Sequence, residues 1–215
     1  MTEKKKPRRT RERILETSLA LFNRRGAPQV TTAEIAGEMG ISPGNLYYHF
    51  RNKDEIVGEL CAAFEARLTP LFADPRGRAV DVEDLWLWLH LLFERMGEYR
   101  FIFRDLDELA AGDRALGARL SRLLRLGVAT MVELCRGMAG AGTMYASERE
   151  IAALAENVVL VATYWQSFAR IGRAPEEAID EAASGRAAWQ VLSLIAPFLV
   201  GDARALIDRL GRDYL

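Results

Sequence analysis

The sequence contains few of the residues that build catalytic and metal sites. Its 215 residues include only two cysteines, Cys61 and Cys135, and two histidines, His49 and His90. The cysteines form no CxxC pair, and neither histidine has another histidine or a cysteine three or four positions away, so we expect no metal site. Glycine-rich phosphate-binding motifs and the GxSxG motif are also missing, and we expect no cofactor. These absences disfavour an enzyme.

Long hydrophobic segments are missing as well. The two longest charge-free runs, 157–169 and 187–201, are shorter than the roughly 20 apolar residues that span a membrane. No signal-peptide core follows the N-terminus, and two lone cysteines suit a reducing compartment, where both should pack as core residues. We therefore expect a soluble, cytoplasmic protein with no membrane partner.

Charge is divided unevenly along the chain. Lysine and arginine total 29 and aspartate and glutamate 30, which gives a formal net charge of −1. Residues 1–53 hold eleven basic and five acidic residues, a balance of +6, whereas residues 54–215 hold eighteen basic and twenty-five acidic residues, a balance of −7. This asymmetry predicts a basic head that meets a polyanion and an acidic body with another role.

Apolar residues recur with the spacing of α-helices, and no stretch alternates convincingly with the period of a β-strand. We predict an all-α fold of about nine or ten helices. Residues 1–10 are rich in lysine and arginine and offer little to bury, so they are predicted to form a flexible arm. The first helix carries an apolar stripe from Ile14 to Phe22 and should end near Gly26 and Pro28.

The most informative segment follows this helix. Thr31 followed by Glu34 is a capping box that begins a short helix. Gly40 supplies the left-handed residue that ends that helix, and Ser42 caps the next one with Pro43 at its first position. Two short helices joined by a tight glycine turn form a helix-turn-helix.

The second helix of this pair should bury Leu46 and Phe50 and turn hydrogen-bond donors outward, with almost no acidic side chain among them. A further helix is predicted to begin at Asn52, with Lys53 exposed in its first turn. Such donors suit phosphate oxygens, although aromatic residues of a helical hairpin can also serve only as core. The candidate DNA contacts are Thr31, Thr32, Ser42, Pro43, Gly44, Asn45, Tyr47, Tyr48, His49 and Lys53.

The basic arm supplies three further candidates. Arg8, Arg9 and Arg11 precede the helix-turn-helix, and basic arms of this kind enter the minor groove beside the site that a recognition helix occupies. The alternative is that the arm is only a solvated tail.

The segment resembles the DNA-binding head of the TetR family of transcriptional regulators. The resemblance rests on residues 31–36 and 39–41, and above all on 42–50, Ser-Pro-Gly-Asn-Leu-Tyr-Tyr-His-Phe, followed by Lys53. It implies a recognition helix at 43–50 in the major groove, with Tyr48 partly packed and partly touching the DNA backbone. It also implies phosphate contacts from Thr31, Asn45, Tyr47, His49 and Lys53.

Pro43 and Gly44 depart from the family pattern, because they stand where family members often place base-reading side chains. Neither can make a side-chain hydrogen bond, so base discrimination should rest on few direct contacts and on DNA shape. The resemblance further implies a DNA-binding domain at 1–54, a ligand-binding and dimerisation domain at 55–215, and a homodimer on a palindromic operator.

The body should contain an apolar cavity. The helix predicted at 81–99 is apolar nearly all round, and a helix without a polar face must be surrounded. In the helix after Asp113 the apolar stripe is interrupted by Gly127, which indicates either close helix contact or space for a ligand.

Polar residues inside apolar helices suggest a pocket for a small hydrophobic effector, although each of them can instead be a satisfied core group. The candidates for this pocket are Trp86, His90, Phe93, Phe103, Arg104, Gly127, Met131, Tyr164 and Gln166.

The charge-free runs lie on helices predicted at 147–171 and 185–200, the second of which Pro197 should kink or end. They hold more apolar surface than one small domain hides, which predicts a dimer interface. Its candidate residues are Leu154, Val158, Val159, Ala162, Trp165, Trp189, Leu192 and Ile195.

Within the body, residues 83–106 are similar to TetR-type regulators of polyhydroxyalkanoate synthesis genes. This narrower resemblance implies control of storage-polyester or fatty-acid genes by an acyl-CoA or fatty-acid metabolite. We therefore predict a homodimeric, ligand-responsive repressor or activator of the bacterial nucleoid. The alternatives are an all-helical enzyme and a protein-interaction module that retains the fold. Basic candidates for the mouth of such a pocket are Arg100, Arg104, Arg119 and Arg122.

Overall fold

The computed structural model describes residues 5–72, 81–171 and 181–210. All regular elements in these ranges are helices, with no β-strand, which confirms the all-α fold class with slightly more helices than expected. The elements are α1 (Lys5–Arg25), α2 (Thr32–Glu38), α3 (Pro43–His49), α4 (Lys53–Leu68), α5 (Val82–Glu98), α6 (Arg100–Arg104), α7 (Leu106–Gly112), α8 (Arg114–Gly140), α9 (Glu148–Arg170), α10 (Glu181–Ile195), the 3-10 helix η1 (Ala196–Phe198) and α11 (Gly201–Leu210).

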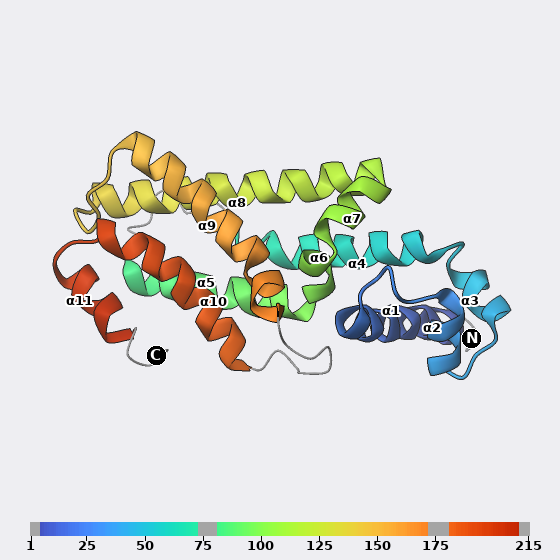
Figure 1. The fold of residues 1–215 in the computed structure, drawn as a ribbon. Helices are drawn as coiled ribbons and strands as arrows, with labels where there is room; N and C mark the ends of the chain where they lie inside the picture. Colours follow the sequence, from blue (N-terminus) through green and yellow to red (C-terminus); the bar gives the residue numbers. More distant parts are fainter. Residues whose placement is uncertain (1–4, 73–80, 172–180, 211–215) are drawn as a thin grey trace.

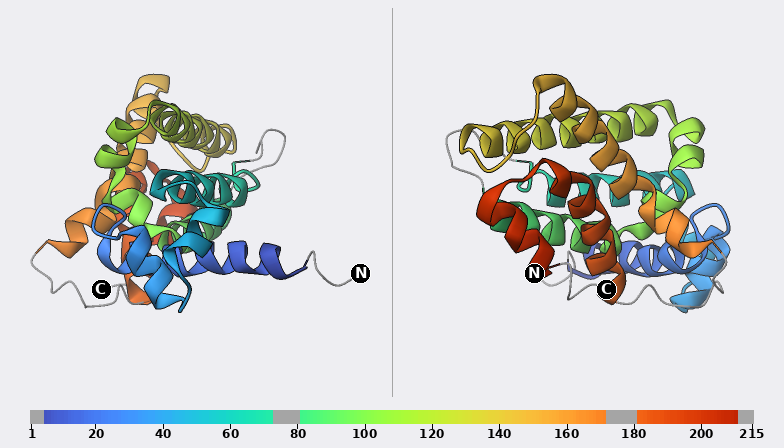
Figure 2. Two further views of the ribbon diagram at one scale, coloured as in Figure 1. Left: turned by 90° about the vertical axis from the view of Figure 1, so that its right-hand side faces the viewer. Right: turned by 60° about the vertical axis from the view of Figure 1, so that its left-hand side comes forward.

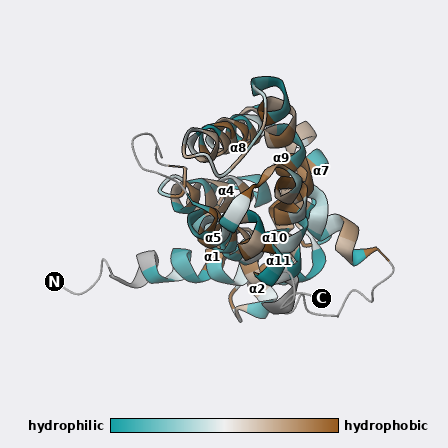
Figure 3. Cartoon of the chain, turned by 90° about the vertical axis from the view of Figure 1, so that its left-hand side faces the viewer, coloured by the Kyte–Doolittle hydropathy of each residue, from teal (hydrophilic) through white to brown (hydrophobic). Residues whose placement is uncertain are grey.

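The helices form a small head and a longer body. Helices α1, α2 and α3 gather at one end of the molecule, and α4 runs from beside them into the body (Figure 1). In the body α8 packs against α9, α9 against α10, and α10 against α5. Hydrophobic residues concentrate where these helices meet, whereas the start of α1 is hydrophilic (Figure 3).

The local signals of the helix-turn-helix are confirmed. Thr31 and Glu34 form the reciprocal capping box at the start of α2, and Gly40 has a φ of 64° between α2 and α3. The hydroxyl of Ser42 accepts a hydrogen bond from the third residue of α3, and the Asn52 side chain caps α4 in the same way. Short polar side chains therefore fix where three successive helices begin.

The head has its own apolar core. Phe22 of α1, Ile35 of α2 and Leu46 of α3 are fully buried, and Phe50 is almost so. The inward positions predicted for Leu46 and Phe50 are confirmed. Ala36 is also fully buried. Its small side chain suits a close crossing of α2 and α3.

The flexible arm predicted for residues 1–10 is wrong for residues 5–10, because α1 begins at Lys5. Lysine and arginine are good helix formers, so the helix continues through residues with nothing to bury. The first turns of α1 project away from the rest of the molecule (Figure 2). Residues 1–4 and the side chain of Arg8 lie outside the described part of the chain.

Helix α5 is not surrounded, contrary to the expectation from its composition. Leu85, Leu89 and Phe93 are buried, but the side chain of Leu87 is 52% exposed. The helix packs against α4, α6, α10 and α11, and these neighbours leave the Leu87 side uncovered.

The ends of the body match their sequence signals. Helix α10 ends at Ile195 and is followed by the 3-10 turn that contains Pro197, as predicted.

Cys61 and Cys135 are free and buried, and burial raises the pKa of each thiol to about 12, which leaves both as core residues. Across the described ranges, the helices are too short or too polar to cross a membrane.

Two glycines mark close approaches between body helices. A Cβ atom added to Gly117 of α8 would lie 2.5 Å from the backbone oxygen of Ala110 in α7. A Cβ atom on Gly127 would lie 3.5 Å from a methyl carbon of Val159 in α9, which is ordinary contact. A Cβ atom would therefore fit at Gly127, and of these two glycines only Gly117 strictly requires a missing side chain.

Replacing Gly117 by alanine should lower the free energy of unfolding by about 1–3 kcal/mol, because a backbone oxygen must move to admit the methyl group. Gly58→Ala is the matched control, since Gly58 lies inside α4 with no atom near the added carbon. That change should raise stability by up to about 1 kcal/mol through helix propensity. Chemical denaturation measures both, and equal effects would contradict the close approach.

Candidate nucleic-acid interface and ligand cavity

Helix α3 presents a polar face without acidic side chains. Leu46 points into the core, whereas Asn45, Tyr47 and Tyr48 are exposed, the two tyrosines by 51% and 79%. The Tyr48 ring packs against the edge of His49, with ring centroids 5.1 Å apart. Ser42, Pro43 and Gly44 are exposed at the N-terminal end of α3. Pro43 has no N–H there, and the Asn45 N–H donates to the Ser42 hydroxyl at 3.2 Å.

Two candidate threonines are partly occupied by local hydrogen bonds. The Thr31 hydroxyl donates to Glu34 Oε2 at 2.9 Å, so its proton serves the cap of α2. The Thr32 hydroxyl and the Tyr47 hydroxyl lie 2.9 Å apart and join α2 to α3. These bonds hold the two helices in one arrangement and leave Asn45 and Tyr48 with freer polar groups.

Lys53 is not freely exposed, contrary to the sequence prediction. Its Nζ donates to the backbone oxygens of Ala27 at 2.8 Å and Pro28 at 3.3 Å. The ammonium thus caps the loop between α1 and α2 from the first turn of α4. One of its three N–H groups stays available for a phosphate.

Two candidate arginines of α1, Arg9 and Arg11, differ in whether other residues hold their side chains. Arg9 is exposed. Arg11 forms an ion pair with Glu59 of α4, and its guanidinium lies 4.6 Å from the centre of the Phe50 ring. Arg11 therefore fastens α1 to α4 and is not a free arm residue, because α1 is already helical at this position.

A polar junction joins the end of α1 to the body. The buried Asn23 side chain donates to the Glu98 backbone oxygen at 2.7 Å and accepts from the Phe101 N–H at 3.1 Å. The Asp105 carboxylate accepts from the Ala27 N–H at 2.8 Å. No local pattern predicts these contacts, because each joins residues 75 or more positions apart.

Arg104 belongs to this junction and does not line the apolar cavity of the body. Its Nη2 donates to the Phe22 backbone oxygen at 2.9 Å, and its Nε donates to Asp105 at 3.0 Å. Gly26 makes room for it, because a Cβ there would lie 2.3 Å from Arg104 Nη2, and its φ of 98° also requires glycine.

A small apolar cavity of about 50 Å³ lies inside the body. Of the nine pocket candidates, Phe103, Gly127 and Met131 line it. Sequence reasoning missed most of its lining, which comes from core positions of five helices and the segment after α4. The other lining residues are Leu68, Phe72, Trp88, Leu92, Met96, Leu123, Leu124, Val158, Val159, Ala162 and Thr163.

The remaining pocket candidates lie elsewhere. Trp86 and His90 stack on each other, with ring centroids 4.1 Å apart, and His90 Nδ1 lies 3.0 Å from the Trp86 backbone oxygen. Phe93 is buried in the core. Tyr164 is 40% exposed and donates to Asp107 at 3.0 Å, and Gln166 is buried outside the cavity lining. Helix periodicity alone does not show which buried face borders free space.

The face of α9 proposed for the dimer is covered within one chain. Leu154, Val158 and Ala162 of α9 are buried, as are Leu192 and Ile195 of α10, because these residues pack α9 and α10 against their neighbours. Only the partly exposed candidates remain near the surface, namely Val159, Trp165 and Trp189.

A different stripe of α9 is open. Leu160 is 58% exposed, Phe168 66% and Ile171 80%, and Tyr164 lies between them on the same side of the helix. Four-residue steps place Leu160, Tyr164 and Phe168 in one row of α9, and Ile171 follows directly after the helix. Helix α9 therefore exposes apolar surface, but on the side opposite to the predicted interface residues Leu154, Val158 and Ala162.

Both the head and the body of the chain match known sequence families. Residues 14–60 match the sequence model of bacterial regulatory proteins of the tetR family, and residues 63–207 match that of TetR bacterial transcriptional repressors. The crystal structure of a TetR-family transcriptional regulator from Marinobacter aquaeolei VT8 is 32% identical, with a TM-score of 0.86 over 95% of this chain and 98% of that chain.

Curated relatives match over a shorter stretch. The HTH-type transcriptional regulator AcrR of Shigella flexneri is 31% identical over 68 residues, which are 32% of this chain and 32% of AcrR. The HTH-type transcriptional repressor KstR2 of Mycobacterium tuberculosis is 43% identical over 54 residues, which are 25% of this chain and 27% of KstR2. The chain thus spans a third or less of the length of these curated relatives.

The α2 cap should be visible in a titration of Glu34. The backbone N–H of Thr31, then Arg25 and then the Thr31 hydroxyl lower the pKa of Glu34 from 4.5 to about 2. Because the folded pKa is below the unfolded one, this stabilisation is complete above pH 4.5 and is lost as the pH falls towards 2. NMR should give a midpoint near 2, and Glu34→Gln should remove this part of the pH dependence of unfolding. A midpoint near 4.5 would contradict the cap.

Proposed function

Because the chain belongs to the TetR family of bacterial transcriptional regulators, we propose that it binds a palindromic DNA operator as a homodimer and that a small hydrophobic effector changes its affinity for that operator. The observation that carries the proposal is the capped helix-turn-helix, whose α3 exposes polar side chains and no carboxylate. In this proposal residues 1–54 bind DNA and residues 55–215 bind the effector and the second subunit.

The exposed groups of α3 divide into two roles. Asn45, Tyr47, Tyr48 and His49 reach phosphate oxygens on both sides of the major groove, and these contacts set the position of the head but read no sequence. Pro43 and Gly44 form a smooth leading end that lets the backbone of α3 approach the bases closely. Sequence preference then comes from apolar contact and from the shape of the DNA.

The effector class is inferred from the apolar cavity of the body and from a sequence resemblance. The apolar cavity beside α6 is the place for a hydrophobic group, and its volume of about 50 Å³ requires either a small group or an opening of the helices. The resemblance of residues 83–106 to regulators of polyhydroxyalkanoate synthesis supports an acyl-CoA or fatty-acid metabolite and control of the corresponding genes. Its effect on DNA binding would come from a shift between two arrangements of head and body.

Selection from random DNA, followed by affinity measurements at several salt concentrations, tests DNA binding by the head. A palindromic sequence should emerge, and the logarithm of the affinity should fall with the logarithm of the salt concentration with a slope of about −0.9 for each phosphate neutralised. Tyr48→Phe should weaken binding to the selected site by about tenfold or more, because one hydrogen bond to a charged oxygen is lost.

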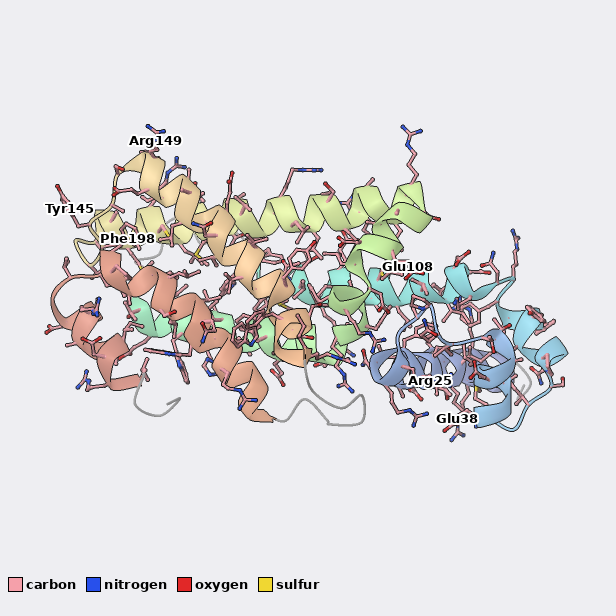
Figure 4. The ribbon with its side chains drawn as sticks, viewed as in Figure 1. Arg25, Glu38, Glu108, Tyr145, Arg149 and Phe198 are labelled. Carbon is pink, nitrogen blue, oxygen red and sulfur yellow. The ribbon has the colours of Figure 1, made fainter. Side chains whose placement is uncertain are left out.

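The matched control is Tyr145→Phe, since Tyr145 is 85% exposed but lies at the end of the body opposite the head (Figure 4). That variant should bind DNA like the wild type. A flat salt dependence, or equal losses in the two tyrosine variants, would overturn DNA binding through this face.

The exposed stripe of α9 is proposed as the dimer interface in place of its buried face. Leu160→Glu should give monomers at concentrations at which the wild type is a dimer, because a charge would be buried between two apolar helices. Operator binding should fall with it, since two heads are needed for two half-sites. Leu87→Glu is the control, as Leu87 on α5 is similarly exposed. Sedimentation that shows a Leu160→Glu dimer would move the interface elsewhere.

A further inference from the structure

Three arginines gather where α6 meets the ends of α1 and α9. On α6, Arg100 Nε donates to the Asn23 backbone oxygen at 3.2 Å, and Arg104 Nη2 donates to that of Phe22 at 2.9 Å. These neighbouring carbonyls belong to the last turns of α1, so the two guanidinium groups lie side by side. Helix α9 descends towards the same place, with Arg170 in its last turn (Figure 1).

The end of α9 is fixed against α6. The Ser167 hydroxyl donates to the Phe103 backbone oxygen at 3.3 Å, and Arg170 follows one turn later. Arg170 is partly buried, and in the described part of the chain it has neither a hydrogen-bond partner nor an ion-pair partner. Within the described residues its guanidinium therefore keeps all of its donors for another group.

The cluster carries excess positive charge. Burial lowers the pKa of Arg170, and the neighbouring charges of Arg104 and Arg100 lower it further. Burial and Arg104 likewise lower the pKa of Arg100. Among the described residues Asp105 acts in the opposite direction on the pKa of Arg170, and its carboxylate already binds Arg104 and the Ala27 N–H. In the described part of the chain these three cations thus share the carboxylate of Asp105.

A buried polar group lies between this cluster and the cavity. Thr163, Gln166 and Arg170 lie on one side of α9, at three-residue and four-residue steps, and Thr163 lines the cavity. Gln166 is only 9% exposed, and its Oε1 has no hydrogen-bond partner among the residues that the structure describes. A helix rises 1.5 Å per residue, so the cavity and Arg170 are separated by about 10 Å along α9. On α6 the same two places are joined by Phe103 and Arg104.

We propose that this strip binds a small organic oxyanion with a short apolar tail. The oxyanion lies among Arg100, Arg104 and Arg170, the Gln166 amide meets a polar group next to it, and the tail enters the cavity at Phe103 and Thr163. Guanidinium groups suit carboxylate and phosphate oxygens because they offer paired, coplanar donors. The cavity volume of about 50 Å³ limits the tail to a few carbons.

The assignment rests on the proposed role of the body as a ligand-binding domain and gives that ligand a chemical class. It also places the ligand against the junction of head and body, since Arg100 and Arg104 already bind the end of α1. A second anionic partner for these arginines would compete with the carbonyls of Phe22 and Asn23. The ligand would then loosen the contact that sets the direction of α1.

Calorimetry on the full chain without DNA tests the site. The probes are butanoate, hexanoate, hexyl phosphate and the neutral hexanamide. Arg170→Gln should weaken oxyanion binding by about tenfold or more, because a charge-assisted contact is lost, and Arg170→Lys should recover part of it. Arg149→Gln is the control, since Arg149 is exposed near the other end of α9 (Figure 4). Its affinities should equal those of the wild type.

Binding of hexanoate or of hexyl phosphate that depends on Arg170 supports the site, and the tighter of the two identifies the head group. The proposal is overturned if no oxyanion binds, if hexanamide binds as tightly, or if Arg170→Gln has no effect. Operator affinity is measured separately. An oxyanion that binds without changing it supports the site and contradicts the proposed regulation. A neutral molecule that alone changes it supports regulation and contradicts this site.

Discussion

The backbone of Ala27 is the point on which the geometry of this protein depends. Its N–H donates to Asp105 of the body, and its carbonyl accepts from Lys53 of α4. Together with the contact of Arg104 to Phe22, these bonds hold the loop after α1 from two sides. Because buried peptide groups are costly to leave unpaired, the head cannot change its angle to the body without replacing these bonds. The direction in which α3 points is thereby tied to α6 and α7.

Lys53 takes part in this constraint. Family resemblance assigns it to a phosphate, and the structure places its ammonium on the loop between α1 and α2. A phosphate that draws Lys53 away also weakens the junction, and a change at the junction alters how Lys53 is held. Such reciprocity is what coupling between a DNA surface and a distant ligand site requires. Arg100 and Arg104 hold the opposite side of the junction, and Phe103 between them lines the cavity.

The body separates packing from association along one helix. The face of α9 with Leu154 and Val158 is needed to fill the space between α8 and α10, so its apolar residues contribute to the monomer. The row of Leu160, Tyr164 and Phe168 stays largely exposed, and the contact it makes with another helix of the described chain is the hydrogen bond from Tyr164 to Asp107. Exposed apolar surface of this kind is expected at an interface between subunits. One side of α9 thus packs in the core of its own chain, and the other side is exposed.

The sequence by itself determined the local structure of the head. Thr31, Gly40 and Ser42 fix helix ends through contacts within a few residues, and a characteristic run of residues around Tyr47 identified the family from the chain alone. It also determined the all-α class, because helical periodicity is a local property. Only the tertiary structure decided which apolar face of α9 is covered, where the cavity lies, and that Lys53 and Arg104 bind backbone oxygens. These outcomes depend on partners that are distant in sequence, and an apolar stripe looks the same whether its partner is a helix of its own chain or of another subunit.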